Sequence, residues 1–177
     1  VRMRSRVALS QALLFIALTL PAAAEDDRKL SFRHDVLPVL SKAGCNGGGC
    51  HGALAGKGGF QLSLNAYDPA TDHYNITREN RGRRIEFAAP ASSLFVTKPT
   101  AAVRHKGGKV LHESSEAYRI LTRWIQQGAP GPSDGDPTIE HVEISPTLSQ
   151  LKKGQAQQLT VRAFFSDGTE RDVTRWA

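Results

Sequence analysis

The sequence predicts a mainly α domain that is followed by a short and incomplete β segment. Two stretches, 31–40 and 115–127, carry apolar residues at helical spacing. The pattern then changes, because apolar residues alternate along the chain between 159 and 165. A stretch rich in proline and glycine separates the two patterns. We therefore expect a helical domain over 25–130, a linker over 131–137 and a partial β domain over 138–177.

Residues 1–24 are predicted to be a secretory signal peptide. An arginine-bearing start precedes an apolar stretch, which ends in Pro21-Ala-Ala-Ala24 and a run of acidic residues. The alternative is a membrane anchor, but the apolar run from Val7 to Leu20 has 14 residues, whereas a spanning helix needs about 20. We expect the mature chain to begin near Glu25 and to work in the periplasm or at the cell surface. Any membrane contact would come from an uncleaved signal.

The net charge of +6 is concentrated at the start of the chain, where Arg2, Arg4 and Arg6 supply half of it. The remaining excess is small and scattered, which argues against a nucleic-acid-binding protein. Two cysteines are too few for a disulfide-rich scaffold.

The first predicted helix begins after Ser31, a residue type that is favoured as an N-cap. Its apolar face carries Phe32, Val36, Val39 and Leu40. Pro38 should kink this helix or restart it.

The clearest helix opens at Ser114-Ser115-Glu116, with Gly128 as its expected C-cap and Pro130 just beyond its end. One face of it carries Ala117, Ile120, Leu121 and Trp124. Trp124 should therefore point into the core.

The region between the two helices is predicted to be irregular. Residues 44–59 hold eight of the sixteen glycines, so no regular element can run through them undisturbed. Residues 60–110 are predicted to be loops and short pieces, with turns at Asp68-Pro69, Arg81-Gly82 and Gly107-Gly108.

One cluster of residues indicates specific chemistry: Cys45 and Cys50 are followed at once by His51. Two thiols and an adjacent imidazole suit covalent attachment of haem c, with the sulfurs bonded to the vinyl groups and the histidine bound to the iron. The usual spacing places two residues between the cysteines, and here there are four, including the flexible run 47–49. A Cys45–Cys50 disulfide and a zinc site that uses both cysteines are the alternatives.

The sequence also resembles a known family. The stretches that carry the resemblance are Phe32–Gly52, Gly59–Leu64, Tyr67–Pro69 and Trp124–Pro130. They are similar to the cytochrome-c-like N-terminal region of large secreted planctomycete proteins. The resemblance implies a class I cytochrome c architecture, with helices around one haem.

The tail of the chain extends this resemblance. Alternating residues from Leu159 to Phe165 and a turn at Asp167-Gly168 predict a β-hairpin, and Phe165–Thr174 is similar to the opening strands of a bacterial group 2 Ig-like domain. The 40 residues of 138–177 are fewer than the roughly 100 of a complete sandwich. We therefore expect further domains C-terminal to this segment.

The sixth ligand of the iron needs a second donor. The one methionine, Met3, would leave with the signal peptide. The remaining donors are His34, His73, His105, His112 and His141, or an open position. In the cytochromes that this chain resembles, the distal loop lies where His105 stands, so His105 is favoured over His112. Ligation by two histidines favours a lower reduction potential than a histidine and methionine pair.

Side chains near the motif allow less specific predictions. The basic run Arg81–Arg84 is typical of a solvated loop, although it could also neutralise haem propionates or dock a redox partner. Phe60, Tyr67 and Trp124 are expected to pack around the haem.

The sequence therefore predicts a mono-haem electron-transfer module, with iron held by His51 and His105 and with an unidentified redox partner protein. No nucleophile-base-acid set is visible, so an enzymatic activity stays uncertain. A haem sensor with an open sixth site, or a surface carbohydrate-adhesion role, is the alternative.

Overall fold

The computed structural model describes residues 28–177, so the predicted signal peptide lies outside it. The helices are a π-helical turn Phe32–Val36, α1 Leu37–Lys42, α2 Pro69–Thr77, α3 Leu94–Thr97 and α4 Glu116–Gln126. Short 3₁₀ turns lie at Leu64–Ala66, Glu79–Gly82 and Pro90–Ser92. The strands are β1 Ile139–Ser145, β2 Thr160–Phe165 and β3 Glu170–Asp172. None of the helices in this described part is long and apolar enough to span a membrane.

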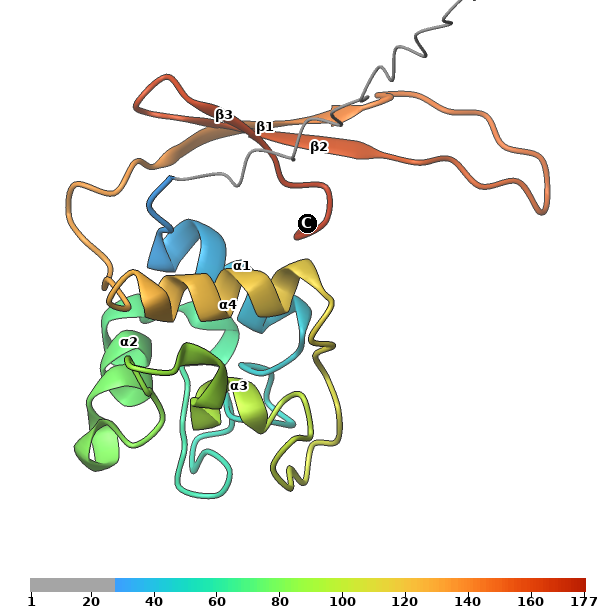
Figure 1. Ribbon diagram of the computed structural model, residues 1–177. Helices are drawn as coiled ribbons and strands as arrows, with labels where there is room; N and C mark the ends of the chain where they lie inside the picture. The colour runs from blue at the N-terminus through green and yellow to red at the C-terminus, as the bar shows by residue number, and fades with distance from the viewer. Residues whose placement is uncertain (1–27) are drawn as a thin grey trace, which may run out of the picture.

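The prediction of a mainly α, class I cytochrome c-like fold is wrong. Residues 28–177 form a mixed structure, with four short α-helices and a three-stranded antiparallel sheet (Figure 1). The longest helix within this range has 11 residues, and long irregular stretches with many glycines connect the helices. Two strong helical patterns in the sequence do not reveal how little of the intervening chain is helical.

The core of the helical body forms where the N-terminal helical segment packs against α4. Trp124 is completely buried, and its ring lies 5.6 Å from Phe32 and 6.1 Å from Phe95, measured between centroids. Its indole N–H donates to the carbonyl of Pro130 at 2.9 Å, so burial leaves no polar atom of the ring unpaired. The predicted position of Trp124 in the core is confirmed.

The first predicted helix is present but divided. Ser31 caps it by accepting a hydrogen bond from the backbone N–H of His34. A single π-helical turn then gives way to α1 at Leu37, and Pro38 stands in the first turn of α1. This agrees with the expected restart, because proline lacks an N–H and is tolerated in a first helical turn.

Helix α4 agrees closely with its prediction. Ser115 accepts a hydrogen bond from the N–H of Tyr118 as N-cap. Gly128, just past the end, has a φ of +88°, which glycine adopts without strain.

Helix α2 was not predicted. Asp68-Pro69 is not a simple turn, because the Asp68 side chain accepts from the N–H of Thr71 at 3.1 Å and Pro69 begins the helix. The expectation of loops and short pieces over 60–110 does not include a helix at this point. The helix matters for the site because its buried Asp72 accepts hydrogen bonds from the N–H and hydroxyl of Ser63.

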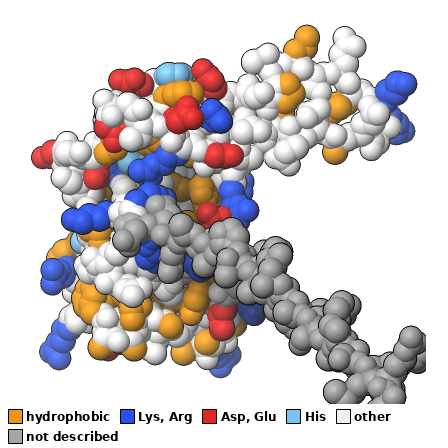
Figure 2. Space-filling model, turned by 45° about the horizontal axis from the view of Figure 1, so that its top comes forward, with side chains coloured by type: hydrophobic (Ala, Val, Ile, Leu, Met, Phe, Trp, Pro, Cys, Tyr) orange, Lys and Arg blue, Asp and Glu red, His pale blue; other side chains and the backbone are white. Residues whose placement is uncertain are grey.

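The three strands form one sheet in the order β1-β2-β3, and the predicted hairpin turn at Gly168 joins β2 to β3. The sheet lies above α1 and α4 in Figure 1. Phe165 is buried on this side, with its ring 5.0 Å from that of His34. The connection between β1 and β2 projects away from the body (Figures 1 and 2), and Leu148 and Leu151 are exposed on it.

Candidate functional site

The end of helix α1 places Cys45. The N–H of Cys45 donates to the carbonyl of Leu40 at 2.8 Å, and the N–H of Gly44 donates to that of Ser41 at 3.0 Å. Gly44 has a φ of +74°. These bonds form a Schellman motif, which ends a helix with a glycine in the left-handed conformation. The first cysteine is thus fixed to the body of the protein by the backbone of α1.

The chain then folds back on itself within the motif. The N–H of His51 donates to the carbonyl of Cys45 at 2.9 Å, and the N–H of Leu62 donates to the carbonyl of His51 at 2.8 Å. A Cβ atom at Gly52 would collide with the carbonyl of Asn46. Asn46 is buried and donates to the Ser41 hydroxyl at 2.9 Å. Glycine is therefore required at position 52 for this close backbone approach.

The two cysteines are free thiols that differ in their surroundings. Cys45 is partly buried and packs against the core, whereas Cys50 is exposed. Burial, with a smaller contribution from Cys50, raises the pKa of Cys45 to about 11. Cys45 is therefore a protonated thiol at neutral pH. The disulfide that the sequence left open is not formed in this structure.

His51 is held by one backbone carbonyl. Its Nδ1 lies 3.0 Å from the carbonyl oxygen of Phe60, and because a carbonyl only accepts, Nδ1 carries the proton. Burial lowers the pKa of His51, and the charges of His105 and Arg84 act in the same direction, against the Phe60 hydrogen bond. The imidazole is thus neutral, with its lone pair at Nε2, which is the form that binds metals.

His105 has the same arrangement on a separate loop. Its Nδ1 lies 2.9 Å from the carbonyl of Gly108, so Nδ1 donates this bond and Nε2 takes no part in it. A Cβ at Gly107 would come within 2.9 Å of the His105 ring. The expected turn at Gly107-Gly108 therefore serves to orient this histidine.

The two imidazoles lie close together and nearly parallel. Their planes differ by 14° and their centroids are 6.3 Å apart. Two histidines that bind one metal from opposite sides, with metal–nitrogen bonds of about 2 Å, place their centroids roughly 6 Å apart. A metal-binding histidine usually donates a hydrogen bond from its second ring nitrogen to an outer-shell partner such as a backbone carbonyl. The separation of His51 and His105 is therefore of the size that an axial haem pair needs.

The segments that carry the two histidines also expose apolar side chains. Four large apolar side chains on the segments that carry them are well exposed to solvent: Leu54, Leu64, Val103 and Val110. A buried group between the segments would remove such surface from water. Among residues 28–177, no group of three or more histidine, cysteine or acidic side chains is arranged to hold a metal ion. An axial haem pair needs only two protein ligands.

The other histidines lie elsewhere. His34 Nε2 is 2.6 Å from the carbonyl of Pro137, and His73 Nε2 is 2.9 Å from that of Ala129. His141 stacks on Phe164 at 4.4 Å in the sheet, and His112 is exposed. Of the five candidate donors, His105 is the one whose ring the structure places against His51.

The remaining predicted side chains have mixed outcomes. Tyr67 is 79% exposed, so its expected packing around a haem stays a prediction. Phe60 does lie against His51, with ring centroids 4.7 Å apart. In the basic run, Arg81 and Arg83 are solvated as expected, but Arg84 is buried. Sequence reasoning missed the burial of Arg84. It also missed the carbonyls of Phe60 and Gly108 that accept from the two histidines, and the only signal for them was the glycine pair after His105.

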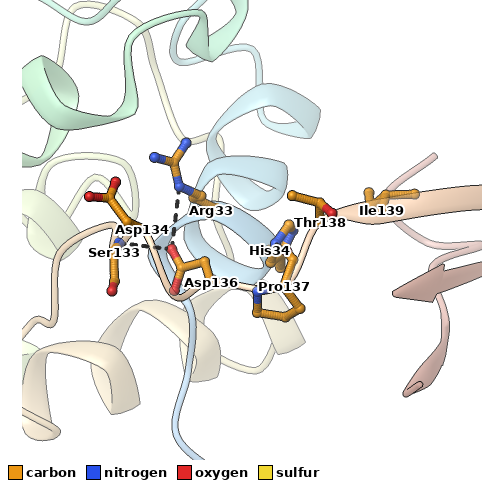
Figure 3. A pocket seen from close by; sticks show the side chains of 8 residues that line it. All are labelled: Arg33, His34, Ser133, Asp134, Asp136, Pro137, Thr138 and Ile139. Carbon is orange, nitrogen blue, oxygen red and sulfur yellow. Dashed lines mark hydrogen bonds and ion pairs between the residues drawn. The ribbon is translucent and has the colours of Figure 1, made fainter. Parts of the chain in front are cut away.

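A separate cavity of about 490 Å³ lies at the junction of the helical body and β1. Figure 3 shows it between Arg33 and His34 of the first helical turn and the predicted linker. Arg33 pairs with Asp136 at 3.3 Å, and the N–H of Ser133 donates to the same carboxylate at 3.0 Å. These contacts fix the linker to the helical body. Neither cysteine lines this cavity.

No protein-family model, curated protein or solved structure matches this chain. The site is therefore interpreted from its own geometry.

Proposed function

We propose that this chain is an exported electron-transfer module that carries one haem c. Cys45 and Cys50 hold the haem through thioether bonds, His51 is the proximal ligand of the iron, and His105 is the distal one. The group supplies a one-electron couple when bound. The chain supplies attachment, orientation and a partly apolar environment.

The observation that carries this proposal is the pair of parallel imidazoles next to the two thiols. Each ring has its Nδ1 on a backbone carbonyl, and the ring centroids are separated by 6.3 Å. One ring directly follows Cys50 in the chain. A neutral imidazole whose Nδ1–H is hydrogen-bonded is a better donor through Nε2. In each histidine, Nε2 is thus the nitrogen that would bind a metal.

The thiols are suited to addition rather than to oxidation. If haem is attached, each S–H would add across one vinyl double bond, forming a sulfur–carbon bond and leaving the hydrogen on the neighbouring carbon. No oxidant is consumed in this step. Cys45 stays protonated because burial raises its pKa to about 11. Gly48 and Gly49 are exposed and have ample space around them, which lets Cys50 adjust its position while Cys45 stays fixed.

Haem binding with an open sixth site is the second candidate, because His105 lies on an exposed loop. All of residues 101–110 except His105 are exposed. Carbon monoxide binding to the reduced protein separates the two candidates. Rapid, tight binding would favour the sensor, whereas slow binding that must displace His105 is expected of the electron-transfer module.

The proposal is tested by producing the chain, with its signal sequence, alongside a haem-attachment system. A pyridine haemochrome assay and intact mass should show one covalent haem. The matched controls are Cys45→Ser, Cys50→Ser and the double variant, because the sequence has no other cysteine. Each single variant should keep one thioether bond, and the double variant should hold no covalent haem. A wild-type chain without covalent haem, or a double variant that retains it, would overturn the proposal.

A further inference from the structure

Arg84 is a buried cation next to the proposed proximal histidine. Its side chain is about 5% exposed. The guanidinium donates to the carbonyls of Asn75 at 2.8 Å and Gly59 at 2.6 Å, and it pairs with the Glu79 carboxylate at 2.9 Å. An arginine keeps its charge in such a place. These partners hold the guanidinium in one position.

Arg84 reaches His51 through Phe60. The guanidinium carbon lies 4.4 Å from the centroid of the Phe60 ring, in a cation–π contact. The same Phe60 ring is 4.7 Å from the His51 ring. Phe60 is also the residue whose carbonyl accepts from His51 Nδ1. One residue thus links the cation to the imidazole by both its ring and its backbone.

The turn that carries Phe60 depends on Arg84 as well. Lys57 and Phe60 exchange backbone hydrogen bonds of 2.9 and 3.1 Å, which closes a tight turn over Gly58 and Gly59. The carbonyl of Gly59 points to the Arg84 guanidinium. Two carbonyl acceptors and a ring face are therefore fixed by one planar cation, a combination that lysine cannot reproduce.

We propose that Arg84 is a positioning residue, which fixes the His51 imidazole through Phe60 and whose charge favours the reduced state of a haem bound there. The inference rests on the proposed function. A fixed positive charge in a partly buried site opposes the extra positive charge of ferric iron, so it raises the reduction potential. Arg84 contacts neither thiol and is not a ligand of the iron.

The test uses the full haem-loaded chain and three variants: Arg84→Gln, Arg84→Lys and, as the matched control, Arg83→Gln at an exposed neighbour. Arg84→Gln should lower the equilibrium constant for reduction by about tenfold, which is about 59 mV for one electron. Arg84→Lys keeps the charge but loses the planar contacts, so its potential should stay near that of the wild type. Arg83→Gln should change it little, because an exposed charge is screened.

A second readout reports the position of His51 directly. Nitrogen NMR of the ferrous haem-loaded chain, and of the haem-free chain, detects whether Nδ1 of His51 carries a proton. It also shows whether that proton is protected from exchange with water. The wild type should show a single, slowly exchanging Nδ1–H. Both Arg84 variants should show faster exchange. If Arg84→Gln does not fold, Phe60→Leu takes its place. That variant removes the ring but keeps the carbonyl, and it should also show faster exchange.

The outcomes separate this inference from the proposed function. A chain that takes up no covalent haem contradicts the proposed function, and the haem-free NMR then still decides the positioning role. A haem-loaded chain in which Arg84→Gln matches Arg83→Gln in both potential and Nδ1–H exchange overturns the inference alone.

Discussion

The two histidines of the candidate site stand on segments that are built very differently. His51 belongs to a segment, residues 43–64, that is joined to α1 by a Schellman motif and to α2 through Ser63 and Asp72. His105 belongs to a loop, residues 101–110, that is almost entirely exposed. One side of the site is therefore fixed before any group binds, and the other side can move.

This difference assigns separate tasks to the two sides. The fixed side holds Cys45 and orients His51, which sets where an attached group lies. On the exposed side, His105 would approach a group attached there. Its ring is oriented mainly by the Gly108 carbonyl and by the absence of a side chain at Gly107. Local stability is expected to differ accordingly, because segments with few buried contacts open most easily.

The largest effect is expected from Gly52→Ala on the fixed side. The new Cβ would collide with the Asn46 carbonyl, which is backbone and cannot move aside easily. We expect a loss of about 3 kcal/mol in the free energy of unfolding and a large loss of covalent haem. Gly49→Ala is the matched control, because a Cβ there meets nothing within 4 Å. Equal stability of the two variants in urea unfolding would contradict the proposed rigidity of this side.

Alkylation should separate the two thiols. The raised pKa of Cys45, about 11, leaves roughly one molecule in a thousand as thiolate at pH 8, whereas Cys50 is exposed. Iodoacetamide should modify Cys50 at least about tenfold faster. The Cys45 rate should rise about tenfold for each pH unit below 11, since the thiolate is the nucleophile. Peptide mass spectrometry measures both rates, and a faster Cys45 would refute the assigned burial.

A smaller effect is expected from Ser41→Ala. This change removes the hydroxyl that accepts from the buried Asn46 amide at 2.9 Å. An unsatisfied buried donor costs about 1 kcal/mol or slightly more. Thermal or urea unfolding measures the loss, and Ser92→Ala, at an exposed serine, is the control. No difference between the two would mean that Asn46 finds another partner.

The smallest change in stability is expected from Gly107→Ala on the exposed side. The Cβ would meet the His105 ring at 2.9 Å, but a side chain on an exposed loop can turn away. We expect less than about 0.5 kcal/mol in the free energy of unfolding, together with a displaced His105. A stability loss as large as that of Gly52→Ala would contradict the comparison between the two sides.

The parts of the fold that the sequence predicts best are those with local signals. Helix α4 has a serine cap, a regular apolar face and a terminal glycine, and the β2–β3 hairpin has alternation and a turn. Helix α2 lacks such a signal, since Ile76 is its one large buried apolar residue and its Asp-Pro start also suits a turn. The mainly α fold class is wrong because two regular helical patterns say nothing about the irregular chain between them.

Within the candidate site, Cys45, Cys50 and His51 lie close together in the sequence, so the sequence alone predicts them as candidate site residues. The expectation that His105 pairs with His51 rests on the proposed likeness to cytochromes, because no local pattern connects two positions so far apart in the sequence. The carbonyls of Phe60 and Gly108 were beyond sequence reasoning, since backbone hydrogen bonds to a side chain depend on the detailed path of a turn. The burial of Arg84 could not be predicted, because a buried arginine within a basic run looks the same in the sequence as its exposed neighbours.

The central claim is that His51 and His105 bind one iron from opposite sides, and low-temperature EPR of the ferric haem-loaded chain tests it most directly. The near-parallel rings, 14° apart, predict a rhombic low-spin signal for the wild type. His105→Ala should convert it to a high-spin signal, while His112→Ala, at another exposed histidine, should leave it unchanged. A high-spin wild type, or a low-spin signal that survives in His105→Ala, would contradict the account.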